Sequence, residues 1–339
     1  MVALEAVRQA NRGLTKAFPK KLTALFVGGT SGIGRSTLCQ FTRHVEEPTV
    51  YIVGRNKQSA APLLSELQTT NPRGSIHFLE ADVSLMRNVD RVCEEVKQRE
   101  KSLNLLFMTP GGISLTGRSE TTEGIDKIFA LRYYARMRFV QNLLHLLENT
   151  TPSRVVSILG GGFEGPMKTD DLDLKNNFSV LNCALHSVTM TTLAMEHLSQ
   201  TTSSPDLSFI HAFPGIVGTN IYTNSFPAPI AALYNYGMWP LMWPFSVNLQ
   251  ESGERHLFQS TSARYPGKGM TEPSALPTRV SVAVGSDGHT GSGVYLTNWK
   301  GETSVGGRTL QRYREDGLPA EVWSHTTELL QRAAARTDV

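Results

Sequence analysis

Short apolar runs alternate with longer stretches of helical periodicity from residue 22 onward. The apolar runs read as strands over 22–29, 49–55, 75–82, 103–109, 154–160, 207–214 and 292–298. Between them, residues 89–100, 129–148 and 179–198 carry apolar side chains at three- and four-residue spacing, which is typical of helices. Nearly continuous apolar strands that alternate with helices favour a parallel sheet buried on both faces. The pattern predicts a doubly wound α/β fold with a seven-stranded, mainly parallel sheet.

The two ends of the chain and one internal segment depart from this rhythm. We expect residues 1–21 to form an amphipathic helical arm, 22–300 the main domain and 301–339 a helical extension. The segment 226–245 is apolar, aromatic and interrupted by four prolines, so it is a poor transmembrane span. We interpret 220–265 as an apolar cap that lines a substrate site. A packed irregular loop and a membrane-surface contact remain alternatives for the proline-rich part.

Composition narrows the function to small-molecule chemistry. The 339 residues are 40% hydrophobic and 19% charged, with a net charge of +3. No basic stripe indicates a nucleic-acid partner, and no His, Asp or Glu spacing indicates a metal site. Cys39, Cys93 and Cys183 fit no disulfide framework, which predicts a reducing, cytoplasmic compartment. The first residues mix acidic and basic side chains before any apolar run, unlike a signal peptide.

A glycine-rich loop gives the strongest functional signal. The sequence GGTSGIG occupies residues 28–34, directly after one predicted strand and directly before a helix. Glycines at this point allow a tight turn and a close approach to a diphosphate, whose charge then faces the amides of the helix. This context predicts a Rossmann-type dinucleotide site. Its expected contacts are Gly28, Thr30, Ser31, Gly32, Ile33 and Gly34.

Residues after the next two strands indicate which dinucleotide binds. The second strand ends at Arg55 and Asn56, where the ribose of a bound cofactor would lie. A guanidinium there suits a 2′-phosphate, whereas an acidic residue would suit a free 2′-hydroxyl. Asp82 and Val83 follow the third strand and are expected beside the adenine. These positions predict NADP(H), with an ordinary surface arginine as the alternative for Arg55.

The motifs and their order resemble the short-chain dehydrogenase/reductase family across about residues 22–300. GGTSGIG matches the family's T-G-x-x-x-G-I-G with Val27 in place of the first threonine, and MTPG at 108–111 replaces N-N-A-G. The segment 214–219 matches P-G-x-V-x-T. The resemblance implies cofactor contacts from Pro110, Gly111, Pro214, Gly215, Val217 and Thr219. The whole pattern is similar to reductase-like proteins of fungal secondary-metabolite clusters.

The resemblance fails at the residues with which this family transfers protons. Alignment puts Gly160 at the serine, Phe178 at the tyrosine, Asn182 at the lysine and Arg132 at the relay asparagine. General acid–base catalysis contributes about 10²–10⁴-fold, so a working enzyme needs substitutes.

We consider Arg132, Tyr133 or Tyr134, and Glu164 as these substitutes. Arg132 could restore the lost positive charge but cannot donate a proton. Glu164 could act as an acid if an apolar pocket raised its pKa. Core packing for the tyrosines, a solvated loop for Glu164 and a supporting role for His186 remain alternatives.

The leading hypothesis is an NADP(H)-binding enzyme that acts on a hydrophobic carbonyl compound of polyketide or terpenoid type. A non-redox cyclase, isomerase or dehydratase on the same scaffold is a second hypothesis, and a non-catalytic cofactor sensor is a third. Because members of this family often pair through two long helices, the resemblance implies a homodimer or homotetramer.

Overall fold

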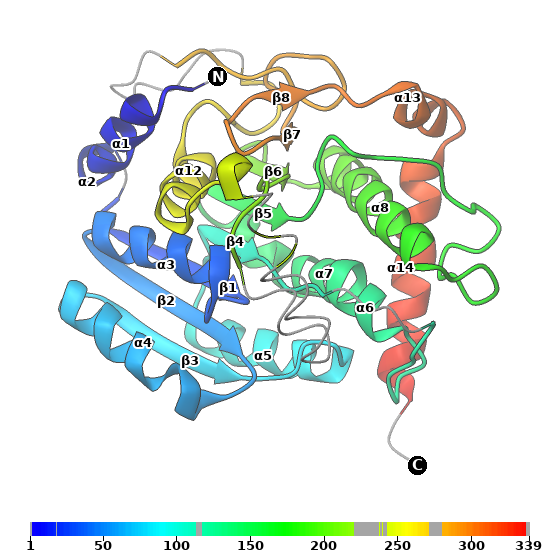
Figure 1. Cartoon of the computed structure of the whole chain (residues 1–339), viewed down its shortest axis with the longest axis horizontal. Coiled ribbons are helices and arrows are strands. Elements are labelled where there is room, and N and C mark those ends of the chain that lie inside the picture. Colours follow the sequence, from blue (N-terminus) through cyan, green and yellow to red (C-terminus); the bar gives the residue numbers. More distant parts are fainter. Residues whose placement is uncertain are drawn as a thin grey trace.

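The strands form one eight-stranded sheet in the order β3-β2-β1-β4-β5-β6-β7-β8 (Figure 1). The computed structural model describes residues 2–17, 19–112, 117–219, 237, 239, 243–270 and 280–336. The strands are β1 Lys21–Val27, β2 Glu47–Gly54, β3 Ser75–Glu80, β4 Leu105–Met108, β5 Ser153–Ile158, β6 Leu207–Ala212, β7 Val294–Thr297 and β8 Thr303–Ser304. All seven predicted strands are therefore confirmed. Only β8 was missed, because two residues are too few to show a periodicity.

Strands β1 to β7 pair in parallel and β8 closes the edge antiparallel to β7. The chain leaves β1 for β2 on one side and returns to β4 on the other. This reversal opens a crevice at the carboxyl ends of β1 and β4, which is where open α/β sheets bind ligands. The predicted doubly wound fold is confirmed.

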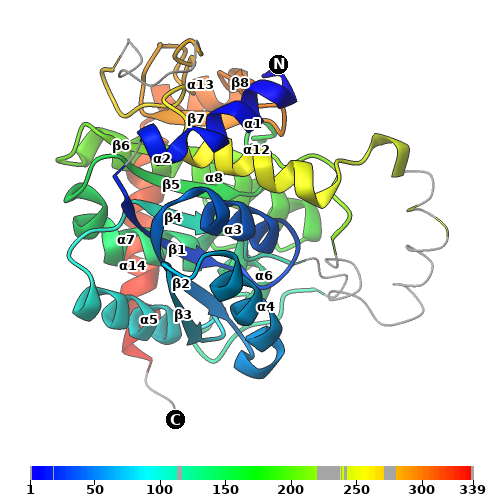
Figure 2. The ribbon, with the colours of Figure 1, turned by 90° about the vertical axis from the view of Figure 1, so that its left-hand side faces the viewer.

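Helices cover both faces of the sheet (Figure 2). On one face lie α5 (Met86–Arg99), α7 (Ala135–Glu148) and α8 (Val180–Thr201). The other face carries α3 (Gly32–His44), α4 (Lys57–Thr70) and α12 (Leu249–Thr261), with α1 (Leu4–Arg12) and the short α2 (Leu14–Ala17) outside them. Strand side chains alternate between the two cores: Leu25 and Val27 point to the first, Ala24 and Phe26 to the second.

Helix α12 corrects the prediction of a cap over 220–265. Its residues from Ser252 to Thr261 are buried, and it packs against α3, α1 and β5. Asn248 caps its first turn by accepting a hydrogen bond from the amide of Glu251 at 2.8 Å. Residues 249–261 therefore belong to the helical layer of the domain. Most of 220–242 lies outside the described residues.

The C-terminal extension packs onto the domain. It contains α13 (Arg308–Glu315) and α14 (Leu318–Ala335), and α14 lies along α8 (Figure 1). Val322, Leu329 and Leu330 of α14 are buried in the same core as α5, α7 and α8. Over the described ranges, no helix combines the length and apolarity needed to span a bilayer.

Candidate nucleotide and substrate site

The glycine loop lies at the crevice between β1 and β4. Gly28 has φ +85° and Gly32 has φ +55°, a region that side-chain-bearing residues rarely adopt. A Cβ on Gly34 would lie 2.3 Å from the carbonyl oxygen of Gly28. Helix α3 begins at Gly32, and its N-cap residue Ser31 makes no capping hydrogen bond with its side chain. The loop thus brings the helix start close to β1, and the Ser31 hydroxyl makes no hydrogen bond within the described residues.

Thr109 joins this loop to the end of β4. Its hydroxyl donates to the carbonyl oxygen of Gly28 at 3.1 Å, and a Cβ on Gly28 would lie 2.5 Å from that hydroxyl. Sequence reasoning named the neighbours Pro110 and Gly111 but missed Thr109. A polar residue at the end of a buried parallel strand, next to glycines, was the available signal.

The loop after β6 reaches the same place. Gly215 has φ +74°, and a Cβ there would meet the Trp299 ring at 2.8 Å. The Thr219 methyl lies 3.2 Å from where a Cβ on Gly32 would be. Val217 forms a parallel bridge with Val247. The structure therefore brings the loops at 28–34, 110–111 and 214–219 to one edge of the sheet.

The residues expected near the adenosine half have mixed environments. Arg55 is exposed and makes no hydrogen bond or ion pair within the described part of the chain. The Asn56 side-chain oxygen instead accepts from the amide of Ser59 and caps α4. The exposed Asp82 accepts from the amide of Ser84 at 3.0 Å, while Val83 is buried. The methyl group of Thr30 lies 2.7 Å from where a Cβ on Gly54 would be, so the end of β2 lies against the glycine loop. Arg55 directly follows this point.

The position aligned with the catalytic serine is sterically closed. A Cβ on Gly160 would lie 2.7 Å from a methyl carbon of Val188 on α8. Even the small side chain of serine would not fit without a shift of this valine. Gly160 is therefore part of the packing of the loop against α8.

Helix α8 reaches Arg132 through Ser187, while Asn182 and Phe178 make other contacts. Asn182 turns back and donates its side-chain amide to the carbonyl of Asn177 at 2.7 Å, and Phe178 packs against the hydrophobic core. Ser187 instead meets Arg132, and Cys183, one turn earlier, lies within the electrostatic field of that arginine. Because adjacent helical residues point about 100° apart, Ser187, five positions after Asn182, points to a different side of α8. Phe178 and Asn182 therefore make other contacts in this structure, and Ser187 is the α8 side chain that accepts from Arg132.

Arg132 lies in a single π-helical turn, η1 (Ala130–Tyr134), between α6 (Lys127–Phe129) and α7. Such turns are frequent at functional sites. Its Nε donates to the Ser187 hydroxyl at 3.0 Å, and its Cγ lies about 4.0 Å from a Cβ built on Gly111. Burial lowers its pKa. Neither of its two terminal nitrogens has a partner among the described residues.

Arg136, one turn later, is a buried arginine that sequence reasoning missed. It is 1% exposed and donates to the Ser157 hydroxyl at 2.6 Å and to the Ile158 carbonyl at 3.0 Å. It also donates to the carbonyl oxygens of Met108 and Pro110. Burial lowers its pKa, since it has no carboxylate partner in the described structure. Arg136 therefore ties the ends of β4 and β5 together.

Glu164 belongs to a buried polar network behind Gly160. One carboxylate oxygen accepts from the Gly162 amide at 3.1 Å and from the Thr192 hydroxyl at 2.7 Å. His211 contacts Thr192 through Nδ1 at 2.8 Å and accepts from the Gly160 amide through Nε2. Burial raises the pKa of Glu164 and, together with the nearby arginines, lowers the pKa of His211 to about 3. The Glu164 side chain is 2% exposed, so it is not a solvated loop carboxylate.

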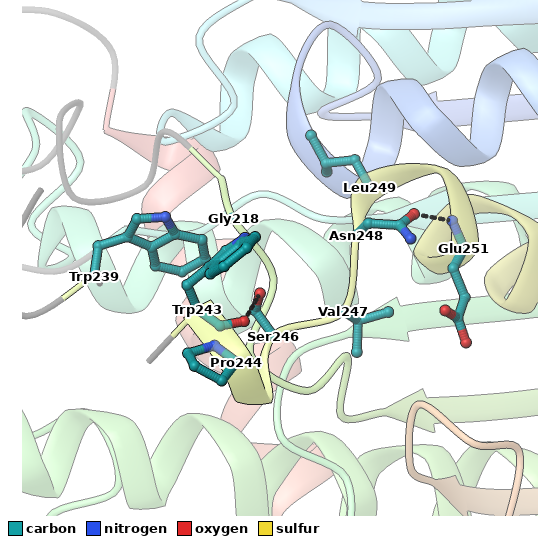
Figure 3. A pocket seen from close by; sticks show the side chains of 9 residues that line it. All are labelled: Gly218, Trp239, Trp243, Pro244, Ser246, Val247, Asn248, Leu249 and Glu251. Carbon is teal, nitrogen blue, oxygen red and sulfur yellow. Dashed lines mark hydrogen bonds between the residues drawn. The ribbon is translucent and has the colours of Figure 1, made fainter. Parts of the chain in front are cut away.

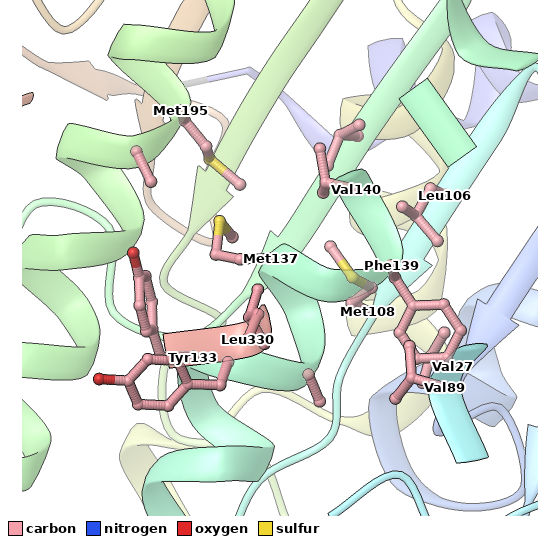
Figure 4. Close-up of a cluster of buried hydrophobic side chains, with 14 of the residues drawn as sticks. Val27, Val89, Leu106, Met108, Tyr133, Met137, Phe139, Val140, Met195 and Leu330 are labelled. Atoms are coloured by element: carbon pink, nitrogen blue, oxygen red, sulfur yellow. The ribbon is translucent and has the colours of Figure 1, made fainter. Parts of the chain in front are cut away.

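The tyrosines beside Arg132 point away from the site. The Tyr133 hydroxyl lies 2.6 Å from the Thr326 hydroxyl and the Tyr134 hydroxyl 3.2 Å from Nε2 of His325, both on α14. Figure 4 shows Tyr133 beside Leu330 in the hydrophobic core. Because these hydroxyls are committed to the C-terminal helix, Tyr133 is removed from the candidate acids. His186 accepts from the Lys168 amide at 2.8 Å and is likewise buried.

A cavity of about 440 Å³ lies beside the loop after β6. Figure 3 shows the side chains of Trp239 and Trp243 at its wall next to Gly218. Val247, Asn248 and the start of α12 form the opposite side. Gly218 directly precedes Thr219, so this cavity, with its two tryptophans, adjoins the glycine loop. In the ranges that the structure describes, no cluster of three or more His, Cys, Asp or Glu residues could hold a metal.

Comparison with known proteins identifies similar chains. The short chain dehydrogenase profile matches residues 22–221. Oxidoreductase AN1596 of Emericella nidulans is 58% identical over 99% of this chain and 100% of its own length. Oxidoreductase andH of Emericella variicolor is 39% identical over 98% and 97%. Among solved structures, YwfH, an NADPH-dependent reductase involved in bacilysin biosynthesis, superposes with a TM-score of 0.55 at 14% identity, covering 71% of this chain and 92% of YwfH.

Proposed function

The chain belongs to the short-chain dehydrogenase family, and from that premise we propose that it transfers a hydride between NADP(H) and a hydrophobic carbonyl compound of polyketide or terpenoid type. The observation that carries the proposal is the positive-φ glycine loop at the β1–β4 crevice, joined there by the loops after β4 and β6. The fungal oxidoreductases that resemble the chain over nearly its full length support an oxidoreductase function.

The residues present fit a dinucleotide. Gly28, Gly32 and Gly34 leave room for a diphosphate at the start of α3, and Thr219 closes the other side of the loop. A bound NADPH supplies the hydride. Its adenosine 2′-phosphate would meet Arg55, whose guanidinium has no protein partner in the described structure.

Arg132 and Glu164 take the catalytic roles in this proposal. Arg132 carries positive charge on the α8 side of the β4 loop, where it would stabilise negative charge that develops on a carbonyl oxygen. It cannot supply a proton. Glu164 holds the only carboxyl group of the described network behind Gly160, and burial raises its pKa toward values useful for an acid. The aromatic cavity beside Gly218 suits the apolar part of the substrate.

The assay for this function follows NADPH absorbance at 340 nm with hydrophobic ketones and enones. Absorbance should fall in proportion to the product formed. The Glu164→Gln substitution should slow turnover and leave the affinity for NADPH unchanged. Asp170→Asn, which alters an exposed acid in the same loop, is the control. Product without loss of NADPH would indicate the non-redox alternative. Nucleotide binding without turnover of any substrate would favour the sensor.

Arg55→Ala should lower the affinity for NADPH about tenfold and leave the affinity for NADH nearly unchanged. A charge-assisted hydrogen bond to a phosphate contributes about 1.5–3 kcal/mol, and each 1.4 kcal/mol is tenfold in affinity. Calorimetric titration with both nucleotides measures the effect. Arg312→Ala, which removes an exposed arginine on α13, should change neither Kd. An equal loss for NADH and NADPH at position 55 would exclude Arg55 from phosphate recognition.

A further inference from the structure

Arg132 has more hydrogen-bond donors than the described structure satisfies. A guanidinium has five N–H donors, and among the described residues only the Nε–H of Arg132 is bound, by the Ser187 hydroxyl at 3.0 Å. Both terminal nitrogens lack a partner in the described chain, although burial already lowers the pKa of this group. A partly buried cation without an acceptor is unfavourable unless a ligand supplies one.

The neighbouring groups increase the positive charge at this point. Arg136, one turn along α7, donates its hydrogen bonds to main-chain carbonyls and to the Ser157 hydroxyl. None of these groups carries a negative charge that would neutralise the guanidinium. The charges of Arg136 and Arg132 both lower the pKa of the buried His211, and the charge of Arg132 also lowers the pKa of Arg136. Glu164, whose side chain is buried behind Gly160, is committed to Gly162 and Thr192.

The missing acceptor is distinct from the cofactor diphosphate. Arg132 contacts α8, which covers one face of the sheet, whereas α3 and its glycine loop lie on the other face. Ser187 accepts from Nε and so restrains the planar guanidinium, whose terminal N–H groups have no acceptor among the described residues. Two parallel N–H groups match the two oxygens of a carboxylate or of a 1,3-dicarbonyl enolate.

We propose that Arg132 binds an oxyanion of the substrate, so that the substrate is an acidic carbonyl compound, either a carboxylate or an enolised 1,3-dicarbonyl. The inference rests on the proposed function, because it places this anion beside the cofactor. It adds that the substrate arrives charged and that Ser187 is a positioning residue, which holds the guanidinium in place.

The test measures probe binding by calorimetry, with and without NADPH. The probes are 2-naphthoate against 2-naphthamide, and the enolate of 5,5-dimethylcyclohexane-1,3-dione against its neutral methyl enol ether. At least one anion should bind about tenfold or more tightly than its neutral partner. Whether naphthoate or the enolate shows the larger ratio distinguishes the two sources of the oxyanion.

The variants assign the effect to Arg132. Arg132→Gln should remove the preference for the anion, while Arg132→Lys should keep part of it. Ser187→Ala retains the charge of Arg132 but removes the acceptor of its Nε–H, so it should lower the affinity for the anion about threefold. This variant replaces Arg132→Gln as the test if Arg132→Gln does not fold. Arg312→Gln should have no effect.

The outcomes separate this inference from the proposed function. Equal binding of anion and neutral partner, or an anion preference that survives in Arg132→Gln, overturns the oxyanion site even if NADPH binds. An Arg132-dependent preference in a protein that binds no nicotinamide nucleotide refutes the proposed hydride transfer and leaves the oxyanion site standing.

Discussion

Gly34→Ala should weaken NADPH binding by about 100-fold or more. A Cβ at this position would lie 2.3 Å from the Gly28 carbonyl oxygen and 2.9 Å from the Thr109 hydroxyl. Because the Gly28 carbonyl is backbone and cannot move aside easily, α3 must shift away from β1. This shift moves the first amides of α3 away from the diphosphate. A displacement that removes two charge-assisted contacts costs about 3 kcal/mol, which corresponds to roughly two orders of magnitude.

Calorimetry with NADPH measures this loss, and a thermal melt checks that the variant folds. Gly307→Ala is the matched control, because Gly307 has a negative φ and open space around a new Cβ. An unchanged Kd in Gly34→Ala would show that the glycine loop does not hold the nucleotide.

Arg136→Met should lower the free energy of unfolding by about 3 kcal/mol. The substitution removes a buried charge, which by itself is favourable, but it leaves the Ser157 hydroxyl and the carbonyls of Ile158 and Pro110 without this donor. Each buried acceptor that loses its partner costs about 1–3 kcal/mol, so the loss of several outweighs the relief.

Denaturant unfolding followed by circular dichroism gives the free energy. Arg138→Met, on the same helix, removes an arginine that pairs with Asp90 nearer the surface and should cost about 1 kcal/mol or less. A smaller loss at Arg136 than at Arg138 would mean that the ends of β4 and β5 do not depend on this side chain.

Most of the fold could be predicted because periodicity is a local property. The apolar runs that became β1 and β4 are continuous in sequence, and each strand alternates between the two cores. The glycine loop could be predicted for the same reason, since its glycines, its strand and its helix are neighbours. The location of α12 could not, because its apolar and polar residues look alike whether they cover a sheet or a substrate.

The catalytic side of the site depends on contacts between distant residues, and there the sequence was a poorer guide. Tyr133 has the hydroxyl that a catalyst needs, yet its partner Thr326 lies 193 positions away on a helix whose docking no local pattern reveals. On α8, no local pattern reveals that the Asn182 amide donates back to the Asn177 carbonyl or that Ser187 accepts from Arg132. Arg136 resembles a surface residue in sequence and is recognised as buried only when β4 and β5 are placed beside it.

The C-terminal helix α14 bears on how the protein behaves on dilution. It covers α8 with Val322, Leu329 and Leu330, and it satisfies the hydroxyls of Tyr133 and Tyr134 from within the same chain. A second copy that docked on this part of α8 would first have to strip α14 away and expose that apolar surface to water. Association through this part of α8 would therefore be unfavourable, and we expect specific activity to stay constant from micromolar to nanomolar protein; a loss of activity on dilution would indicate an oligomer that uses another surface.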